Sequence, residues 1–328
     1  MPVTMKEIAD AAGVSKTTVS KIINGTDNHI SEETKRRIRK LIEEMGYVPN
    51  SVARNLRSQR TGMIGFILPD ITNPFFPMMA RGIEDKAKML GYGVVMCNTD
   101  DNAESELQQL NFLTSKMIDG IIFIRSLRES SMKRALQSKV PIVIADRDIK
   151  VASDGIGQVF VDTVGGIQLA TNVLLNSGCR RIGFISAQQD IEENRFDGYR
   201  RALAKAQISF DEGWVYTDRY NVETGREGIK SIFRHGGADG IVCGNDLIAF
   251  GAIQELKDEG YRIPEEVKVI GFDNIYFSQY TEPPLTTIEQ PAYEIGQCAA
   301  EMLIENILHG VPLGRKILNY RLVSRKSV

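Results

Sequence analysis

The stretch Met63-Ile64-Gly65-Phe66-Ile67-Leu68 is an apolar run without a polar side chain. Continuous runs of this kind are typical of strands that are buried on both faces of a parallel sheet. Segments with helical spacing separate it from further runs of the same type. The runs occupy residues 93–97, 120–124 and 141–145, and the helical segments occupy residues 81–90, 104–117 and 130–138. This alternation predicts an α/β lobe built around a doubly wound parallel sheet.

The same alternation of apolar runs and helical segments starts again later in the chain, with apolar runs at residues 181–186, 240–243 and 267–272. We therefore predict a second doubly wound parallel-sheet lobe, and we assign residues 62–328 to the two lobes together. With 328 residues, of which 42% are hydrophobic, the chain is long enough for two or three domains with ordinary cores.

Residues 1–46 follow another pattern, that of a small all-α unit. Thr4 and Glu7 have the spacing of a capping box, so a first helix should begin between them, and Gly13 should end it. Ser15 caps a second helix that runs to about Ile23. Two short helices joined by a tight turn form a helix-turn-helix, whose second helix fits the major groove of DNA. A third helix with an apolar stripe completes the unit.

Charge is divided unevenly along the chain. Residues 1–60 hold 11 Lys and Arg against 7 Asp and Glu, whereas the remaining residues hold 29 against 35. A basic module on an acidic body suggests a polyanionic partner for the module alone. Together with the helix-turn-helix pattern, this surplus predicts double-stranded DNA as the partner.

Cysteine and histidine spacing gives no sign of a metal site. The four cysteines and three histidines are scattered, without a CxxC pair or other metal-ligand spacing. We expect buried free thiols, no metal and no cofactor. No apolar run approaches the ~20 residues of a membrane span and no signal peptide is visible, so we expect a cytoplasmic protein that joins the nucleoid when it binds DNA.

Residues 47–61 join the two parts and contain a short helical pattern. Pro49 stops the preceding helix, Asn50 can cap a new one, and about two turns follow that carry Arg54 and Leu56. Isolated helices below ~12–15 residues rarely persist in water. The segment therefore needs a partner to fold on, and we expect that partner to be DNA.

The first fifty residues contain the motifs Val3-Thr4-Met5-Lys6-Glu7-Ile8-Ala9, Ala12-Gly13-Val14-Ser15, Thr18-Val19-Ser20, Ile23-Asn24, Gly46-Tyr47 and Pro49-Asn50. Together they resemble the headpiece of LacI/GalR-type bacterial transcription repressors. The resemblance implies that the second helix contacts both bases and phosphates of the operator. The implied base contacts are Lys16, Thr17 and Lys21, and the implied phosphate contacts are Ser15, Thr18, Ser20 and Asn24.

In this family the linker helix forms on DNA, lies in the minor groove and inserts a leucine into the central base step. Leu56 matches that leucine, and Val52 and Ala53 would pack against the partner subunit, with Asn50 and Arg54 completing the hinge. The alternative is that Leu56 is an ordinary core residue of a linker helix. The outward basic residues of the third helix either contact phosphates or form a solvated face; they are Lys35, Arg36, Arg37, Arg39 and Lys40.

Residues 62–328 look like the periplasmic sugar-binding-protein fold that forms the core of this repressor family. The resemblance implies that the chain crosses between lobes near Val161, Gln290 and Leu318. Lobe 1 would then hold residues 62–160 and 291–317, and lobe 2 would hold residues 161–290 and 318–328.

Ligands of open parallel sheets bind at the carboxyl ends of the strands. The residues at these ends match the sugar-contacting pattern of ribose-binding-type proteins and the related repressors. Carboxylates and amides bind hydroxyl pairs, guanidinium groups reach sugar oxygens, and aromatic rings cover the apolar side of a sugar. The effector-binding set is Asn73, Phe75, Phe76, Asp146, Arg147, Arg195, Tyr220, Asn245, Asp273 and Gln290, with Asp70 following the same strand as Asn73.

Some of these residues also have a purely structural interpretation. Phe75, Phe76 and Tyr220 could be core aromatics, and Asp146-Arg147 could form a salt bridge at the end of a strand. We predict that Asp246, which follows Asn245 in the sequence, caps a helix from residue 247.

The sequence gives little support to catalysis. Asp146 and Asp273 are a pair of acids such as a glycosidase uses, but they come from different lobes. There is no GxxxxGK loop, no GxSxG elbow and no GxGxxG after a strand. We expect a binding protein and no enzyme.

We therefore predict a homodimeric, DNA-binding transcriptional repressor that is controlled allosterically by a sugar or sugar derivative. The operator should be pseudo-palindromic, because a two-fold dimer reads two half-sites. The dimer surface should lie on the core and include the helix 77–90. The alternative is a regulator with the same fold that is controlled by a protein corepressor, as in catabolite control.

Overall fold

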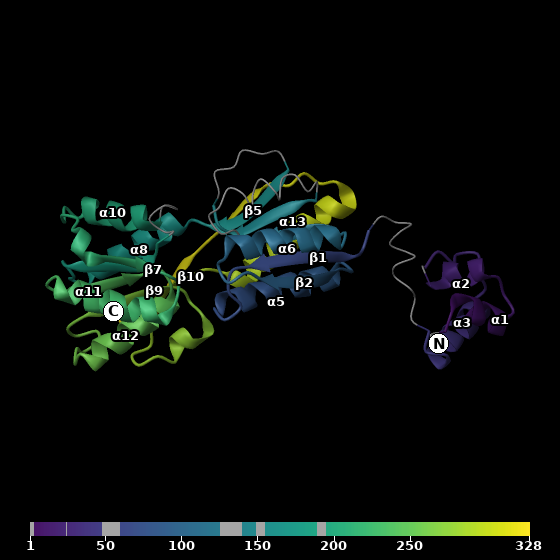
Figure 1. Cartoon of the computed structure of the whole chain (residues 1–328), viewed down its shortest axis with the longest axis horizontal. Coiled ribbons are helices and arrows are strands. Elements are labelled where there is room, and N and C mark those ends of the chain that lie inside the picture. The colour runs from purple at the N-terminus through teal and green to yellow at the C-terminus, as the bar shows by residue number, and fades with distance from the viewer. Residues whose placement is uncertain (1–2, 24, 48–59, 125–139, 149–154, 189–194) are drawn as a thin grey trace. The chain divides into compact units, whose positions relative to one another are not determined.

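The computed structural model of the chain describes residues 3–23, 25–47, 60–124, 140–148, 155–188 and 195–328 (Figure 1). The predicted helix at 130–138 and most of the linker lie outside the described residues. Internal contacts divide the chain into two units, Met1–Thr61 and Gly62–Val328.

The first unit consists of α1 (Met5–Ala12), α2 (Lys16–Ile23) and α3 (Glu32–Glu44). The predicted capping box is present, because the Thr4 backbone N–H donates to Glu7 Oε2 at 2.7 Å and the Glu7 N–H donates to Thr4 Oγ1 at 3.3 Å. Gly13 ends α1 with φ +64°, a left-handed conformation that suits glycine. Ser15 accepts from the Thr18 N–H at 3.1 Å and thereby caps α2. The predicted helix-turn-helix is thus confirmed.

One apolar core holds the three helices together. Ile8, Val19 and Ile38 contribute one fully buried side chain from each helix. Tyr47 is also buried in this core, although we had placed it at the start of the linker. Its ring packs in the core because the chain turns back at Gly46, where φ is +61° and the Tyr47 N–H reaches the Ile42 carbonyl at 3.0 Å.

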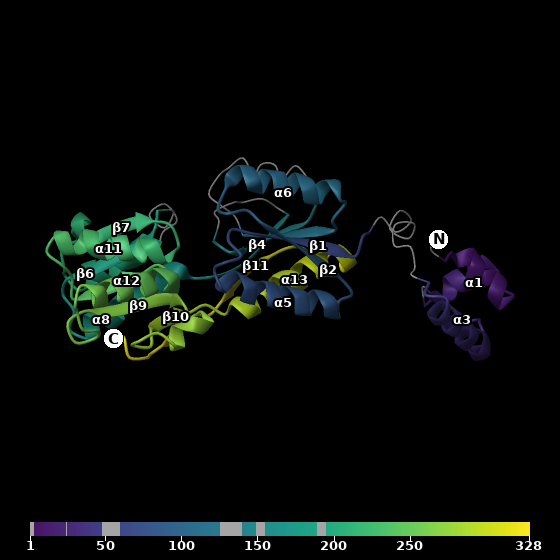
Figure 2. The same ribbon diagram turned by 60° about the horizontal axis from the view of Figure 1, so that its bottom comes forward.

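Lobe 1 of the second unit contains a six-stranded sheet in the order β11-β5-β4-β3-β1-β2, and all its neighbouring strands are parallel. Helices α5 (Phe75–Met89) and α13 (Ala292–His309) cover one face, and α6 (Ala103–Ser115) covers the other (Figure 2). The strands are β1 (Met63–Leu68), β2 (Gly93–Asn98), β3 (Gly120–Phe123), β4 (Ile142–Asp146), β5 (Ile156–Val161) and β11 (Arg315–Leu318).

Helix α5 begins earlier than the apolar spacing predicted. The Asn73 side chain accepts from the Phe75 N–H at 3.1 Å and satisfies a donor at the start of the helix. Pro77 lies in the first turn, where a missing N–H costs no helical hydrogen bond. Asn73, Phe75 and Phe76 therefore sit on the first turn of a rigid helix and its cap.

Lobe 2 contains a second six-stranded sheet, in the order β12-β10-β9-β8-β6-β7. Helices α8 (Thr163–Asn176) and α10 (Arg195–Lys205) pack on one face, and α11 (Val222–Arg234) and α12 (Asp246–Asp258) pack on the other. Short 3-10 helices, η1 (Glu212–Trp214) and η2 (Tyr276–Gln279), are also present. The strands are β6 (Ile182–Ala187), β7 (Val215–Asp218), β8 (Gly240–Cys243), β9 (Lys268–Asp273), β10 (Thr286–Glu289) and β12 (Arg321–Val323).

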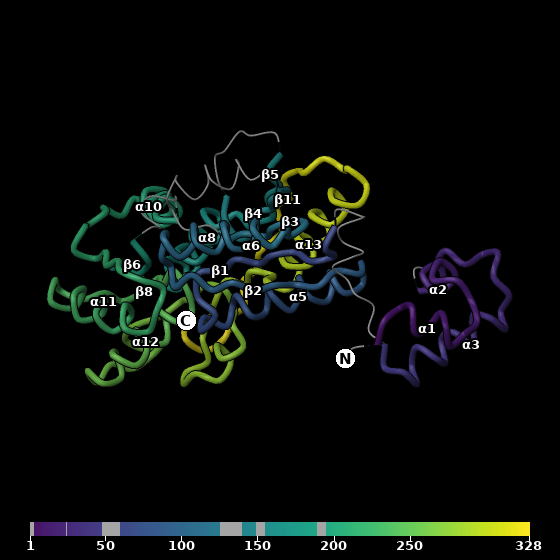
Figure 3. Tube along the Cα trace, turned by 45° about the vertical axis from the view of Figure 1, so that its right-hand side comes forward, coloured from purple at the N-terminus to yellow at the C-terminus, as the bar shows by residue number. Residues whose placement is uncertain are grey.

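The chain passes between the two sheets after β5, after β10 and after β11. Strand β11 lies beside β5 in lobe 1 although the two are far apart in the sequence (Figure 3). Its continuation β12 re-enters lobe 2 next to β10 and runs antiparallel to it, whereas we predicted purely parallel sheets. The reason is that β10 leaves lobe 2 along the path by which β12 returns.

Candidate ligand-binding site

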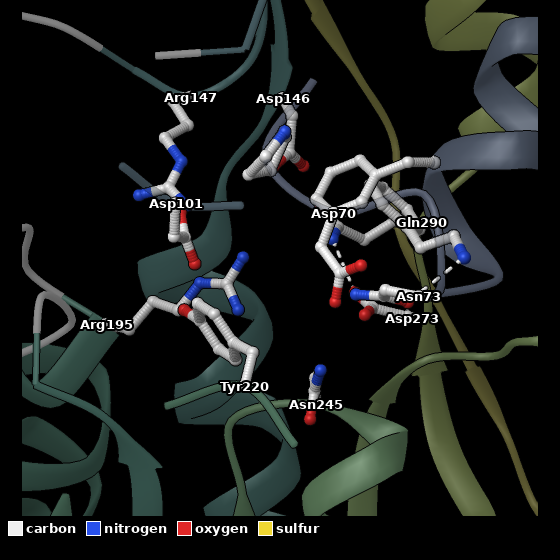
Figure 4. Close-up of a pocket in the computed structure, with 13 residues that line it drawn as sticks. Asp70, Asn73, Asp101, Asp146, Arg147, Arg195, Tyr220, Asn245, Asp273 and Gln290 are labelled. Atoms are coloured by element: carbon white, nitrogen blue, oxygen red, sulfur yellow. Dashed lines mark hydrogen bonds between the residues drawn. The ribbon is translucent and has the colours of Figure 1, made fainter. Parts of the chain in front are cut away.

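A cavity lies between the carboxyl ends of the strands of lobes 1 and 2 (Figure 4). The space between its walls, including the part that is open to solvent, measures about 470 Å³. All ten predicted effector-binding residues line it, so the structure brings the whole predicted set together. The lining residues are Pro69, Asp70, Asn73, Phe75, Phe76, Asp101, Asp146, Arg147, Arg195, Tyr220, Asn245, Asp273 and Gln290.

The lobe 1 wall begins with the loop that follows β1. Phe75 and Phe76 are buried with their rings edge to face, 5.4 Å apart between centroids, and they also belong to the lobe 1 core. Phe75 and Phe76 are therefore core residues that also line the cavity, and their contact with a ligand stays a prediction. The Asp70 carboxylate accepts from the N–H and hydroxyl of Thr72 at 2.8 and 2.7 Å, which fixes the turn that leads into α5.

The upper part of the same wall comes from the ends of β2 and β4. Asp146 ends β4 with a left-handed backbone, φ +71°, and its side chain is buried. Arg147 points away from Asp146 and toward Asp101 in Figure 4. Burial raises the pKa of the Asp101 carboxyl, and the charge of Arg147 opposes this rise. Asp146 and Arg147 thus extend into the cavity in different directions.

Arg195, at the start of α10, is held firmly in the lobe 2 wall. Its Nη1 donates to the Gly244 carbonyl at 2.9 Å. The guanidinium carbon lies 4.9 Å from the centroid of the Phe272 ring and 5.5 Å from that of Tyr220. Such cation–π contacts restrict a planar guanidinium to one orientation. Tyr220 therefore lines the cavity and also orients the arginine.

Asn245 caps α12, whereas we had assigned this role to Asp246. The Asn245 Oδ1 accepts from the Ile248 N–H at 2.9 Å, and the helix begins at Asp246, one residue earlier than predicted. The Asp246 carboxylate is turned inward and accepts from the Ile275 N–H and from two hydroxyl groups. The cap prediction was wrong because those three donors come from distant segments and hold the carboxylate away from the helix end.

Asp273 and Gln290 form a hydrogen-bonded pair at the base of the cavity. Gln290 Nε2 donates to Asp273 Oδ1 at 2.7 Å, and both side chains are buried. Burial raises the pKa of the Asp273 carboxyl well above its ordinary value, and the nearby guanidinium of Arg195 opposes this rise. The raised pKa favours the protonated carboxyl, which can both donate hydrogen bonds to hydroxyl groups and accept them.

Two lining residues, Pro69 and Asp101, were absent from the sequence prediction. Asp101 follows β2 by three positions, so the same strand-end rule could have found it. In lobe 1 the sequence prediction covers the carboxyl ends of β1 and β4 and omits that of β2. Asp70 had been noted after the first strand without being placed in the binding set.

The predicted base-contacting residues lie on one helix of the first unit. Lys16, Thr17 and Lys21 are exposed on α2, whose opposite face buries Val19 and Ile22. Ser15 and Thr18 hydroxyls lie 2.9 Å apart at the start of α2, and Ser20 is half-buried. The other predicted DNA-contacting residues lie outside the described residues; they are Asn24, Asn50, Val52, Ala53, Arg54 and Leu56.

Several basic residues of α3 form ion pairs within the first unit. Lys35 lies 2.7 Å from Glu32 and 3.7 Å from Asp27, and Arg39 also lies 3.7 Å from Asp27. Lys40 pairs with Glu44 at 3.5 Å. These contacts favour the solvated-face interpretation for Arg39 and Lys40, which are exposed, whereas the Lys35 side chain is largely buried.

In the described ranges, His, Cys, Asp and Glu side chains form no group of three or more that could hold a metal ion. Within the same part of the chain, no helix is long and apolar enough to cross a membrane. Cys97, Cys179 and Cys243 are buried free thiols, and Cys298 is half-buried.

A helix-turn-helix unit in one chain with a two-lobed core defines a DNA-binding regulator that carries a ligand-binding module. The family model "Bacterial regulatory proteins, lacI family" matches residues 4–50, and the model "Periplasmic binding protein-like domain" matches residues 171–328. The chain belongs to the lacI family and is a DNA-binding transcriptional regulator.

Three relatives illustrate the range of the family. The transcriptional regulator RegA of Clostridium saccharobutylicum is 36% identical and covers 100% of this chain and 99% of its own. The ribose operon repressor of Halalkalibacterium halodurans is 34% identical, covering 93% and 90%, and catabolite control protein A of Priestia megaterium is 34% identical, covering 92% of each. The solved structure of a LacI family regulator from Enterococcus faecium with bound ribose is 30% identical, with a TM-score of 0.73, and covers 81% of this chain and 98% of its own.

Proposed function

We propose that the protein is a homodimeric transcriptional repressor whose affinity for its operator is set by a neutral sugar bound between lobes 1 and 2. The observation that carries this proposal is the cavity that both lobes line with carboxylate, amide, guanidinium and aromatic side chains. This combination suits the hydroxyl pairs and the apolar face of a sugar ring. The ribose operon repressor and the ribose-bound structure among the relatives support a sugar of this class.

The charge of the cavity favours a neutral ligand. Its lining contains four aspartates, Asp70, Asp101, Asp146 and Asp273, against the two guanidinium groups of Arg147 and Arg195, and burial raises the pKa of Asp101 and Asp273 and so favours their neutral forms. A phosphate or a sugar acid would bring further negative charge into this partly buried space, where like charges repel strongly. We therefore propose an uncharged monosaccharide and not a sugar phosphate.

The DNA-binding role rests on α2. We propose that Lys16, Thr17 and Lys21 read base edges in the major groove, since they are exposed on the helix that a helix-turn-helix presents to DNA. Ser15, Thr18, Ser20 and Asn24 would then contact phosphates. The residues proposed for the minor-groove hinge are Asn50, Val52, Ala53, Arg54 and Leu56.

A dimer is proposed because one short headpiece reads too few base pairs for specific binding. The α5 surface that we expected in the interface is mixed, since Met78 is exposed whereas Met79 is fully buried in the lobe 1 core. Met78 is therefore the residue of this pair that remains available to a partner. The proposed site of action is the cytoplasm, where the operator is accessible.

The proposed mechanism is a shift between two arrangements of lobes 1 and 2. A sugar that contacts both walls binds one arrangement better, and its differential affinity sets the size of the effect on the hinge. Induction results if the sugar-bound arrangement separates the two hinge segments of the dimer. Corepression results if it brings them together.

Control by a protein corepressor is the second candidate, and the relationship to a catabolite control protein supports it. The two candidates differ in whether they need a polar cavity between the lobes. A regulator controlled only by a protein does not need a polar cavity lined from both lobes, so sugar control is the favoured proposal.

The test measures the melting temperature of the purified protein with D-ribose, other neutral pentoses and hexoses, and ribose 5-phosphate, followed by operator gel shifts with each sugar that binds. We expect a neutral sugar to raise the melting temperature and change operator affinity, and we expect its recovery unchanged after incubation. Asp273→Ala should abolish the response and leave operator binding without sugar intact. A normal sugar response in Asp273→Ala would show that the cavity is not the effector site.

A further inference from the structure

The Asp246 carboxylate lies where three segments of lobe 2 meet, and it does not line the cavity. The residue is fully buried. Its Oδ2 accepts from the Ile275 N–H at 2.9 Å and from the Ser278 hydroxyl at 2.5 Å, and its Oδ1 accepts from the Thr287 hydroxyl at 2.6 Å. A single carboxylate therefore joins the start of α12 to the turn after β9 and to β10.

Each of these three segments carries a residue of the cavity. Asn245 directly precedes Asp246, Asp273 lies two residues before Ile275, and Gln290 follows Thr287 by three residues. On the cavity side, the hydrogen bond from Gln290 to Asp273 joins the segment after β10 directly to the end of β9. The buried Asp246 carboxylate therefore connects the segments that carry the polar lobe 2 lining, although it does not line the cavity itself.

The turn that carries Asp273 needs such support. Asp273 has φ +111° and Asn274 has φ +55°, so two successive non-glycine residues adopt conformations that L-residues rarely occupy. Backbone of this kind persists only when surrounding contacts determine it. The bond from the Ile275 N–H to Asp246 comes directly after these two residues. Strand β9 also passes close by, because a methyl group added to Gly271 would overlap Asp246 Oδ1.

We propose that Asp246 is a positioning residue of the sugar-binding cavity, which holds the Asp273 turn and the strand leading to Gln290 in place without touching the ligand. The part of this proposal that is tested by sugar binding rests on the proposed function. Removing the carboxylate leaves three donors without their acceptor and releases the turn, so the cavity loses the geometry of its main hydroxyl acceptor.

The first test is D-ribose binding to the full-length protein by calorimetry. Asp246→Ala should weaken binding roughly tenfold or more, since each lost buried hydrogen bond is costly. Asp246→Asn should stay within roughly threefold of wild type. Its amide oxygen can accept from Ile275 and Ser278, while its NH₂ group donates to the Thr287 hydroxyl. Equal weakening in both variants would overturn the proposal.

Two neighbouring threonines of β10 give a matched comparison if Asp246→Ala fails to fold. Thr286 and Thr287 are both buried, and their hydroxyl groups have different partners. Thr287 donates to Asp246, whereas Thr286 Oγ1 accepts from the Arg325 N–H at 2.9 Å. Thr287→Val should weaken ribose binding and Thr286→Val should not. Similar losses in the two variants would show a general loss of stability and contradict the positioning role.

The second test does not need a sugar. Amide hydrogen exchange over residues 273–280 of the ligand-free protein should be faster in Asp246→Ala and Thr287→Val than in wild type and Thr286→Val. If exchange changes in this way and no neutral sugar binds wild type, the proposed function is wrong and the positioning role stands. Unchanged exchange in Asp246→Ala, or in Thr287→Val if the alanine variant does not fold, would refute the positioning role.

Discussion

Asp246→Asn should raise the stability of the core at neutral pH. Burial raises the pKa of the Asp246 carboxyl to about 6, from an ordinary 3.8, and hydrogen bonds from Ser278, Thr287 and Ile275 only partly oppose this rise. A difference of about two pKa units corresponds to roughly 3 kcal/mol between the charged and neutral forms. Asparagine keeps the shape of the side chain and removes the buried charge, so the free-energy cost of burying that charge should disappear.

The stability gained by Asp246→Asn should increase as the pH rises. Below about pH 4 the carboxyl is protonated in both the folded and the unfolded protein, and the penalty is absent. Between about pH 4 and pH 6 the unfolded state has released its proton while the folded state still holds it, so the wild type loses stability as the pH rises through this range and the loss is complete above about pH 6. The difference between Asp246→Asn and wild type should therefore grow by roughly 3 kcal/mol between pH 4 and pH 7.5.

Urea unfolding of both proteins at a series of pH values measures this difference. The groups whose charges act with that of Asp246 are Arg325 from the C-terminal segment, Asp273 from the end of β9 and Cys243 from β8, and they are present in both proteins. Asp258→Asn, at the exposed end of α12, serves as the control and should change stability by less than about 1 kcal/mol. A difference that is flat, or that shrinks as the pH rises, would refute the argument that burial dominates the energetics of Asp246.

Three other substitutions test separate parts of the molecule. Leu56→Ala should weaken operator binding roughly tenfold or more in gel shifts and leave ribose affinity unchanged, if the hinge inserts this side chain into a base step. Arg195→Lys should weaken ribose binding by roughly tenfold or more in calorimetry, because an ammonium group cannot reproduce the stacked guanidinium between Tyr220 and Phe272. Gly296→Ala should destabilise the core by about 1–3 kcal/mol in urea unfolding, because the added methyl group overlaps the Met79 carbonyl where α13 crosses α5.

The fold was predictable because its strands are buried on both faces and read as continuous apolar runs, of which Met63–Leu68 is one. The order of the strands also made the cavity residues predictable. Parallel strands end at one edge of a sheet, so residues that follow different strands converge there even when they are far apart in the sequence. Asp70 and Asp101 also follow strands at this edge, so the rule applied to every strand end predicts both.

Asp246 could not be predicted from local sequence. A capping preference depends on neighbours within one helical turn, whereas the donors that hold this carboxylate lie 29, 32 and 41 residues away. The position of β12 was missed for a similar reason, since its direction follows from the path of β10 through the fold. Contacts between distant segments decided both cases.

We propose that the pair Asp273 and Gln290 links ligand binding to a change in the arrangement of lobes 1 and 2. Gln290 lies directly after β10, at one of the places where the chain passes between the lobes, and its amide already donates to the Asp273 carboxylate. A sugar hydroxyl that bonds to Asp273 must share this carboxylate with Gln290, so the ligand acts on the crossing segment itself. The other wall, with Asn73 and Asp146, belongs to lobe 1. The proposed ligand, which contacts both walls, therefore binds one arrangement of the lobes better than the other, and its preference for that arrangement limits how far it can shift the hinge.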